Sequence, residues 1–285
     1  MTRRSLTRTL APGATFAGGA ALVVLGARQL VRRQAIVARR VIGKPLGEDA
    51  PSADKVYRSK SGNPLDLLLL GDSIAAGLGA DRAKRTLGAQ LAKRLADRTN
   101  RSVRLHTAAV VGSETSMLRS QLSGLPRHYV ADVAVIIVGG NDVTHRIKTS
   151  VSCDHLASAV TALHAEGTHV VVGTCPDLSA LTAVPQPLRT IIGVASRQLA
   201  TAQRATVTGI GARAVSLGEV VGPFFVAEPV KMFAIDRFHP SSAGYRRTAK
   251  AMMPSILAAL GDDSELPFGH HGPAPGVTSA GVSYL

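Results

Sequence analysis

The sequence contains no tryptophan, few other aromatic residues and only two cysteines. Phe, Trp and Tyr together make up 4% of the 285 residues. The few aromatic side chains are not interleaved with the basic ones, so the chain lacks the stacking platform of a nucleic-acid-binding surface. Cys153 and Cys175 are the only cysteines. Their even number leaves two possibilities open, a disulfide in an exported protein or two buried thiols in a cytosolic one.

Acidic residues are also scarce, and the resulting positive charge is unevenly distributed. The net charge is +14, but residues 1–60 hold 12 Lys and Arg against 3 Asp and Glu, whereas residues 61–285 hold 21 against 16. Most of the excess therefore lies outside the expected domain, and we predict no nucleic-acid partner. A basic segment next to an apolar one is typical of attraction to a membrane surface.

The apolar segment comprises residues 9–27, which are 19 uncharged residues between Arg8 and Arg28. It is just long enough to span a bilayer, and the preceding Arg3-Arg4 pair resembles a twin-arginine export signal. We predict that residues 1–40 are an export signal or membrane anchor with basic flanks, which places the protein in the cell envelope. Two alternatives stay open. The excess of Arg after the segment favours the cytoplasmic face of the membrane, and the segment could instead be a helix packed on the domain.

From residue 66 onward, short apolar runs alternate with helical patterns, which is typical of an α/β fold with a parallel sheet. Strands are expected at residues 66–70, 103–107, 132–138, 169–174 and 214–217. Helices are expected at residues 88–99, 152–166, 188–206 and 241–260, the last one kinked or ended early by Pro254. We predict a three-layer α/β/α domain over residues 63–260 with a five-stranded parallel flavodoxin-like sheet. A linker at 41–62 precedes it and a mobile C-terminal tail at 261–285 follows it.

Four short motifs follow predicted strands in one order along the chain. They are Gly71-Asp72-Ser73, then Gly112, then Gly139-Gly140-Asn141-Asp142, then Asp236-Arg237-Phe238-His239. In a doubly wound sheet the ligand crevice lies outside the carboxyl ends of the strands. We therefore expect the four motifs to meet in one crevice.

The motifs supply the parts of a nucleophilic acyl-transfer site. Serine is a weak nucleophile until a base takes its proton, and His239 can accept the proton of Ser73 and return it to a leaving group. Asp236 can hold the imidazole ring and stabilise its charged form. The oxyanion formed by attack on an ester needs preorganised donors. The amides of Ser73 and Gly112 and the side chain of Asn141 are the candidates.

Taken together, the motifs resemble those of the SGNH hydrolases, also called the GDSL esterase/lipase family. The match covers roughly residues 64–260, and Ile74 stands where this family usually has Leu. The resemblance implies that Ser73 is the nucleophile, that Gly112 and Asn141 are oxyanion residues, and that Asp236 and His239 are the D-x-x-H pair. It also implies hydrolysis of an acyl ester or thioester, with no metal and no other cofactor.

A concentration of phenylalanines precedes His239. Four of the six lie within fifteen residues of each other: Phe224, Phe225, Phe233 and Phe238. This concentration predicts a wall for an acyl chain, with Met232 as an adaptable neighbour, and we take the substrate-binding residues to be Phe224, Phe225, Met232 and Phe233. Alternatively, the rings only pin the loop onto the sheet.

Other kinds of site lack their signatures. His145, Cys153, Asp154 and His155 do not have a familiar metal-ligand spacing, so no metal site is predicted. The glycines at residues 71–79 lack the Lys-Ser/Thr of a phosphate loop.

Two rival functions remain. An acyltransferase would use the same triad and pass the acyl group to a glycan or lipid hydroxyl instead of water. A non-catalytic envelope-binding module would have the same fold but no catalytic activity. The sequence predicts an esterase or lipase that acts on an acyl ester substrate.

Overall fold

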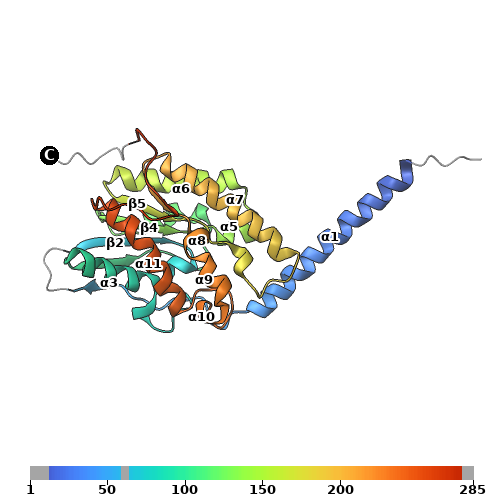
Figure 1. Cartoon of the computed structure of the whole chain (residues 1–285), viewed down its shortest axis with the longest axis horizontal. Helices are drawn as coiled ribbons and strands as arrows, with labels where there is room; N and C mark the ends of the chain where they lie inside the picture. Colours follow the sequence, from blue (N-terminus) through green and yellow to red (C-terminus); the bar gives the residue numbers. More distant parts are fainter. Residues whose placement is uncertain (1–12, 59–63, 278–285) are drawn as a thin grey trace, which may run out of the picture.

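The computed structural model describes residues 13–58 and 64–277 (Figure 1). Within these residues, seven strands form one sheet in the order β1-β3-β2-β4-β5-β6-β7. The strands are β1 Val56–Tyr57, β2 Leu65–Gly71, β3 Val103–Thr107, β4 Val133–Ile137, β5 His169–Gly173, β6 Arg213–Val215 and β7 His270–His271. The central five strands are parallel, and the two edge strands are antiparallel to their neighbours.

The prediction of an α/β fold is confirmed, but a purely parallel five-stranded sheet is wrong because the sheet is mixed and has seven strands. The two additional strands come from segments 41–62 and 261–285, which the sequence assigned to a linker and a tail. β1 pairs with β3, and β7 pairs with β6. Each is only two residues long, too short for an alternating pattern to show in the sequence.

The helices lie before, between and after the strands. The longer ones are α1 Gly13–Ile42, α3 Leu87–Thr99, α6 Thr149–Ala165, α7 Leu188–Thr208 and α11 Ser242–Ala259. The shorter ones are α2 Ser73–Ala76, α4 Leu118–Ser123, α5 Gly140–His145, α8 Leu217–Val220, α9 Gly222–Ala227 and α10 Pro229–Met232, with 3₁₀ turns η1 Ala83–Arg85, η2 Thr115–Met117 and η3 Leu178–Ala180. Helix α11 starts at the predicted Ser241 cap, whose Oγ accepts hydrogen bonds from the amides of Ala243 and Gly244. Of the kink or early end expected at Pro254, the early end is wrong, because the helix continues to Ala259.

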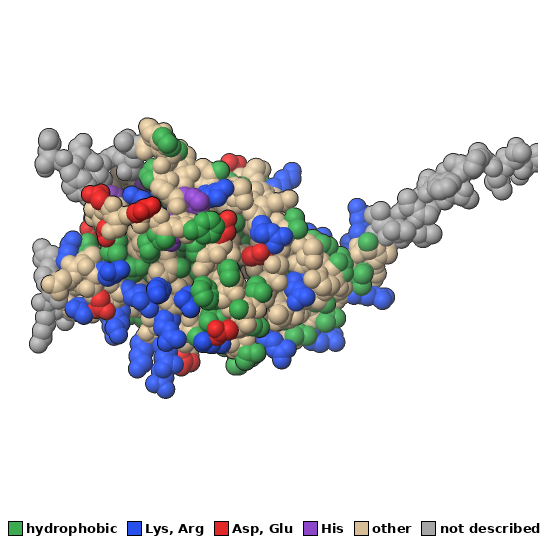
Figure 2. All heavy atoms as spheres, viewed as in Figure 1, with side chains coloured by type: hydrophobic (Ala, Val, Ile, Leu, Met, Phe, Trp, Pro, Cys, Tyr) green, Lys and Arg blue, Asp and Glu red, His purple; other side chains and the backbone are tan. Residues whose placement is uncertain are grey.

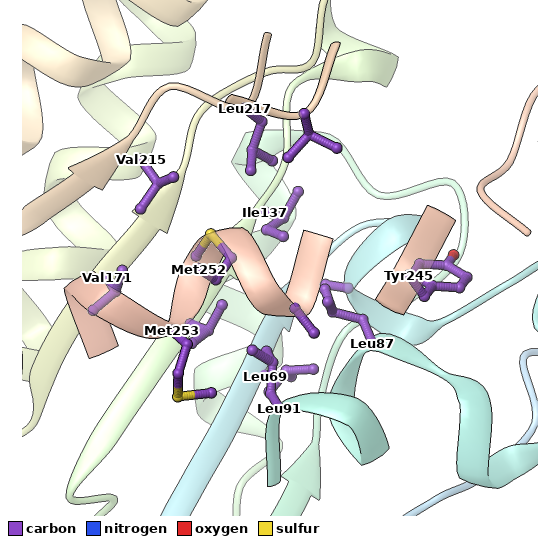
Figure 3. Close-up of a cluster of buried hydrophobic side chains, with 14 of the residues drawn as sticks. Leu69, Leu87, Leu91, Ile137, Val171, Val215, Leu217, Tyr245, Met252 and Met253 are labelled. Atoms are coloured by element: carbon purple, nitrogen blue, oxygen red, sulfur yellow. The ribbon is translucent and has the colours of Figure 1, made fainter. Parts of the chain in front are cut away.

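Helices cover both faces of the sheet, with α3 and α11 on one side and α6 and α7 on the other (Figure 1). The alternation of side chains along β2 shows why both faces are covered. Leu67 and Leu69 point into the core beneath α3 and α11, where Met252 of α11 also packs (Figure 3). Leu68 and Leu70 point into the opposite core, beneath α4 and α6. All four leucines are almost completely buried, and each contributes about 1.5–3 kcal/mol relative to an exposed side chain.

The chain order of the five parallel strands is that of a flavodoxin-like sheet. β3 lies on one side of β2, and β4, β5 and β6 follow on the other. The order reverses between β2 and β4, and ligands bind at such a switch point outside the carboxyl ends of the strands. The Ser73 motif follows β2 and the Asn141 motif follows β4, so the two motifs flank this point.

Helix α1 is the longest element and extends away from the body of the domain (Figure 1). Its 30 residues make it about 45 Å long. Ala38 is buried, and Val31, Ala35 and Ile42 pack against the main core. The second half of α1 therefore packs on the domain, while the Arg3-Arg4 pair lies outside the described residues. In the described part of the chain, no helix combines the length and the apolar character needed to cross a bilayer.

Both cysteines are buried free thiols in the structure. Cys153 of α6 and Cys175, which follows β5, belong to one small apolar cluster that also contains Leu199 of α7. Burial raises the pKa of both thiols. Of the two possibilities that the sequence left open, the structure has the thiols.

Candidate active site

Ser73 is presented by a tight turn at the end of β2. Gly71 has φ +127°, and a Cβ atom there would lie 1.9 Å from the carbonyl oxygen of Ile137 on the neighbouring strand, so only glycine fits. Asp72 caps α2 by accepting a hydrogen bond from the Ile74 amide at 2.9 Å. Ser73 is the first residue of that helix. The turn thus places the Ser73 hydroxyl at the carboxyl edge of the sheet.

The base and its orienting carboxylate lie directly beside this hydroxyl. The Nε2 atom of His239 is 2.9 Å from Ser73 Oγ, and its Nδ1 atom is 2.6 Å from Asp236 Oδ2. The other oxygen of Asp236 accepts hydrogen bonds from the amides of Phe238 and His239, both at 3.0 Å. These contacts have the geometry that a nucleophile, a base and an orienting carboxylate have in a catalytic triad.

The charge of Asp236 is set by two opposing effects. Burial alone raises the pKa of this carboxyl, but the hydrogen bonds from His239 and Phe238 outweigh burial and hold the pKa below its ordinary value. Asp236 is therefore ionised near neutral pH. A buried carboxylate beside Nδ1 fixes the ring orientation and stabilises the imidazolium form.

The predicted oxyanion residues meet Ser73 from two other loops. Asn141 lies in the first turn of α5, and its Nδ2 atom donates a hydrogen bond to the Ser113 carbonyl at 2.9 Å. A side-chain amide has two N–H donors, so the second is available to a substrate. Gly112 precedes Ser113 in the loop after β3 and has φ +82°. Gly112, Asn141, Ser73 and His239 line one continuous groove.

Two buried polar side chains hold residues 108–115, the segment after β3 that we call the oxyanion loop for its predicted role, and neither side chain was given a role from the sequence. Gln121 of α4 accepts a hydrogen bond from the Gly71 amide at 2.9 Å, and its Nε2 atom donates to the Gly71 carbonyl at 2.8 Å and to Ser113 Oγ at 3.1 Å. Asp142 accepts from the Thr115 amide at 3.1 Å and from the Ser152 hydroxyl at 2.8 Å. Gln121 thus joins the nucleophile turn to the oxyanion loop, and Asp142 joins that loop to α6.

A family model for GDSL-like lipases and acylhydrolases matches residues 69–247, a span that contains all four motifs. A GDSL-like esterase of Mycobacterium tuberculosis is 36% identical over 294 residues, which cover 98% of this chain and 91% of that protein. The chain belongs to the GDSL-like lipase/acylhydrolase family. It is therefore an enzyme of the carboxylic ester hydrolase class.

Solved structures share the fold of this GDSL-like hydrolase. An α/β hydrolase from the metagenome of Lake Arreo, Spain, superposes with a TM-score of 0.55 at 19% identity, over 70% of this chain and 97% of that one. A lipase from a goat-rumen metagenome superposes with a TM-score of 0.52 at 19% identity, over 68% of this chain and 97% of that one. At this identity the likeness concerns the fold.

Beside the triad, the GDSL-like hydrolase has a narrow apolar pocket of about 80 Å³. Phe225 and Phe233 line it, with ring centroids 4.8 Å apart at an interplanar angle of 70°. Phe224 and Met232 lie elsewhere: the Phe224 ring lies against the Arg247 guanidinium at 3.7 Å, and Met232 is buried in the core. The structure thus brings two of the four predicted substrate-binding residues to the pocket.

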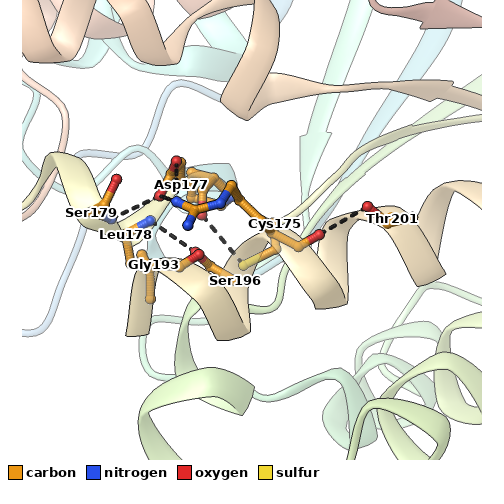
Figure 4. Close-up of polar contacts among 9 residues, drawn as sticks. Cys175, Asp177, Leu178, Ser179, Gly193, Ser196 and Thr201 are labelled. Carbon is orange, nitrogen blue, oxygen red and sulfur yellow. Dashed lines mark hydrogen bonds and ion pairs between the residues drawn. The ribbon is translucent and has the colours of Figure 1, made fainter. Parts of the chain in front are cut away.

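The η3 segment also lines this pocket, and no sequence pattern identified it. Leu178 and Leu181 line the pocket. The Leu178 amide donates to Ser196 Oγ of α7 at 3.1 Å, and the Asp177 carboxylate pairs with Arg197 at 2.9 Å (Figure 4). These contacts with α7 hold this segment in place.

Asp72 is a second buried carboxyl next to the nucleophile. Burial raises its pKa to about 7, although the hydrogen bond from the Ile74 amide and the proximity of His239 oppose this. Asp72 and Asp142 both stand in motifs read from the sequence, but nothing in those motifs gave them a role. Gln121 lies outside every motif, so no sequence signal pointed to it.

The residues considered as metal ligands do not gather into a site. In the described ranges, no group of three or more His, Cys, Asp or Glu side chains is arranged to hold a metal ion. His145 instead pairs with Glu114, with Nδ1 2.6 Å from Oε1.

Proposed function

We propose that this hydrolase cleaves acyl esters through an acyl-enzyme intermediate on Ser73. The observation that carries the proposal is the unbroken chain of contacts from Ser73 Oγ through His239 to Asp236, at 2.9 and 2.6 Å. A hydroxyl within hydrogen-bonding reach of an oriented imidazole is the arrangement that activates a serine.

In the first half-reaction, His239 Nε2 takes the Ser73 proton while Oγ attacks the ester carbonyl carbon. The negative charge moves to the carbonyl oxygen, where the amides of Ser73 and Gly112 and the side-chain amide of Asn141 stabilise it. The carbon–oxygen bond to the alcohol then breaks, and His239 returns the proton to the departing alkoxide. Ser73 is left acylated.

In the second half-reaction, a water molecule takes the place of the alcohol. His239 removes its proton, the resulting hydroxide attacks the acyl carbon, and the same donors hold the second oxyanion. The bond to Ser73 breaks and Oγ recovers the proton from His239. The products are a carboxylic acid and the free enzyme.

Labelling with a fluorophosphonate tests this proposal. We expect the native protein to be labelled and to hydrolyse short acyl esters, and Ser73→Ala to do neither. Ser116→Ala is the matched control, because Ser116 is an exposed serine of η2, and it should behave like the native chain. A folded native protein that is not labelled would contradict the proposal and favour a non-catalytic binding module.

The wide groove beside Ser73 supports acyl transfer as a second candidate function. Its volume of about 1530 Å³ leaves room for an acceptor alcohol larger than water. Transfer would follow the same steps, with the hydroxyl of a glycan or lipid attacking the acyl-enzyme. Adding candidate acceptors to an ester assay and measuring the ratio of acylated product to free acid distinguishes transfer from hydrolysis.

We further propose that the protein works at the cell envelope, with its basic N-terminal segment at a membrane surface. The charge pattern supports this, since 12 Lys and Arg lie within residues 1–60 and such segments are attracted to anionic lipids. Protease protection in intact cells tests the side of the membrane. Digestion of the domain by external protease indicates export, and protection indicates the cytoplasmic face.

A further inference from the structure

The site has two openings that are both lined mainly by apolar side chains, and only the wider one also contains Lys and Arg side chains. One is the narrow pocket, whose lining is mainly apolar and includes Phe225, Phe233 and Leu178. The other is the wide groove, which we call the α1 groove. It runs from Ser73, Asn141 and His239 to the second half of α1, with α5 and α7 on its sides. An ester consists of an acyl part and an alcohol part. The narrow pocket suits the acyl part, and the α1 groove suits the alcohol part.

Helix α1 is fixed in position as a wall of this groove. The Gln34 side chain accepts a hydrogen bond from the Leu188 amide at 3.0 Å and donates to the Gln186 carbonyl. Leu188 is the first residue of α7, and Gln186 lies two residues before it. Ala38 of α1 is buried in the main core of the domain. The residues of α1 that face the groove are thereby held in a constant relation to Ser73.

The α1 groove carries positive charge without matching negative charge. Four cationic side chains line it: Arg32, Arg39, Lys44 and Arg146. Lys44 pairs with Glu48, whereas the other three form no ion pair with any described residue. The carboxylates in the lining are Glu48, paired with Lys44, and Asp236, engaged by His239.

Two of these arginines belong to one face of α1. Arg32 and Arg39 are seven residues apart, which is two helical turns, so they lie above one another on the groove side. Arg33 and Arg40 follow them by one residue each, and all four arginines are exposed, but only Arg32 and Arg39 line the groove. In Figure 2, separate Lys and Arg side chains lie around the junction of α1 with the domain, and a denser group of them lies on the lower part of the domain.

We propose that the alcohol part of the ester lies in the α1 groove and carries an anionic group, which Arg32 and Arg39 recognise. The inference rests on the proposed function of Ser73. The acyl part occupies the narrow pocket. A guanidinium forms paired, charge-assisted hydrogen bonds with carboxylate or phosphate oxygens, so the recognised group is a carboxylate or a phosphate. The chemical step is unchanged, and the anionic alcohol leaves with the proton from His239.

Two butyrate esters of similar shape test the proposal. In the first, butyrate is esterified to the phenol oxygen of 4-hydroxybenzoate, whose free carboxylate is anionic at about pH 7.5. In the second, butyrate is esterified to the phenol oxygen of 4-hydroxybenzamide, which is neutral. A third, the butyrate ester of 4-hydroxybenzyl phosphate, separates phosphate from carboxylate recognition. We expect the native enzyme to have a higher kcat/KM for the anionic esters, mainly through a lower KM, and this preference should weaken with added salt.

The matched variants reverse charge on the two faces of one helix. In Arg32→Glu/Arg39→Glu, kcat/KM for the anionic esters should fall about tenfold, with the neutral ester unaffected. Arg33→Glu/Arg40→Glu changes the net charge equally and should leave all three esters unchanged. Thermal unfolding of both variants checks that α1 stays packed.

Fluorophosphonate labelling keeps the two proposals separate. If Ser73 is not labelled in the native chain, the proposed function fails. If Ser73 is labelled in every variant but the native enzyme shows no preference for anionic esters, the inference about the α1 groove is overturned. Equal losses in the two double variants overturn it as well, because they would show an effect of overall charge.

Discussion

The base side and the nucleophile side of the proposed active site are built in different ways. Asp236 and His239 are three residues apart, and Asp236 also accepts the amide hydrogens of Phe238 and His239. The four residues 236–239 therefore fix the orientation of the His239 ring through contacts among themselves. The surroundings of Ser73 are instead assembled by contacts across 50 residues, from Gln121 to Gly71, and across 28 residues, from Asn141 to Ser113.

The difference separates what a short motif can encode from what the fold must supply. A D-x-x-H segment needs only one turn and one buried carboxylate to orient its imidazole. An oxyanion hole needs donors from different loops to converge on one point, and buried side-chain hydrogen bonds fix those loops relative to each other. We therefore expect damage to the base side to affect chemistry alone, and damage to the nucleophile side to affect both stability and chemistry.

The largest effect is expected from Asp236→Asn, which breaks the base side. The Asn oxygen can still accept the amide hydrogens of Phe238 and His239, but the carboxylate that stabilises the imidazolium is gone. We expect kcat to fall about 10⁴-fold, with little change in KM or Tm. Steady-state ester hydrolysis measures this, with exposed Asp154→Asn as a control. A loss smaller than tenfold would falsify the role of Asp236.

Removing an oxyanion donor is expected to have the next largest effect. In Asn141→Ala the side-chain donor and the hydrogen bond to the Ser113 carbonyl are both lost. We expect kcat to fall about 10²- to 10³-fold. Rates with one short acyl ester and the extent of fluorophosphonate labelling, which reports whether Ser73 remains reactive, should be measured together. A variant with a native kcat would show that Asn141 does not contact the oxyanion.

The two buried glutamines offer a matched test of positioning. Gln203 of α7 resembles Gln121, since it accepts from the Cys175 amide at 2.7 Å and donates to the Val138 carbonyl at 3.0 Å. Its partners adjoin the turn that carries Asn141, but it forms no hydrogen bond with the Ser73 turn or with the loop that carries Gly112. Replacing either glutamine by Leu leaves buried backbone groups unpaired, and we expect each Tm to fall by roughly 4–10 °C.

Only the Gln121→Leu variant should also lose activity, by about tenfold in kcat at a temperature where both variants are folded. Gln121→Glu keeps the acceptor for the Gly71 amide and should recover part of the loss. Equal kcat values for the Gln121 and Gln203 variants would mean that Gln121 supports the fold alone.

The smallest effect is expected from Asp72→Asn, which keeps the oxygen that caps α2. The folded pKa of about 7 lies above the ordinary value of 3.8. Between these values the folded chain holds a proton that the unfolded chain has released, so stability falls as pH rises from about 4 to 7. The variant should therefore gain stability relative to the native chain at pH 8 and show much less gain at pH 4. Denaturant unfolding at both values measures this, and a gain independent of pH would contradict the elevated pKa.

Much of the scaffold could be predicted from the sequence, because its signals are local. The leucine run at β2 and the Ser241 cap of α11 each depend on a few neighbouring residues. The order of the motifs at strand ends then placed Ser73 and His239 in one crevice, and the structure has them in contact.

What could not be predicted depends on distant partners. Gln121 and Asp142 are ordinary polar residues in the sequence, and only the folded chain shows which backbone groups they satisfy.

The two-residue strands β1 and β7 have a consequence for the sheet as a whole. Without them, β3 and β6 would present unpaired backbone groups at open edges, and such edges invite pairing between molecules. Each short antiparallel strand covers part of one edge and is itself too brief to template another chain. The family-matched residues 69–247 contain neither β1 nor β7. The segments flanking the catalytic motifs thus protect the sheet against self-association.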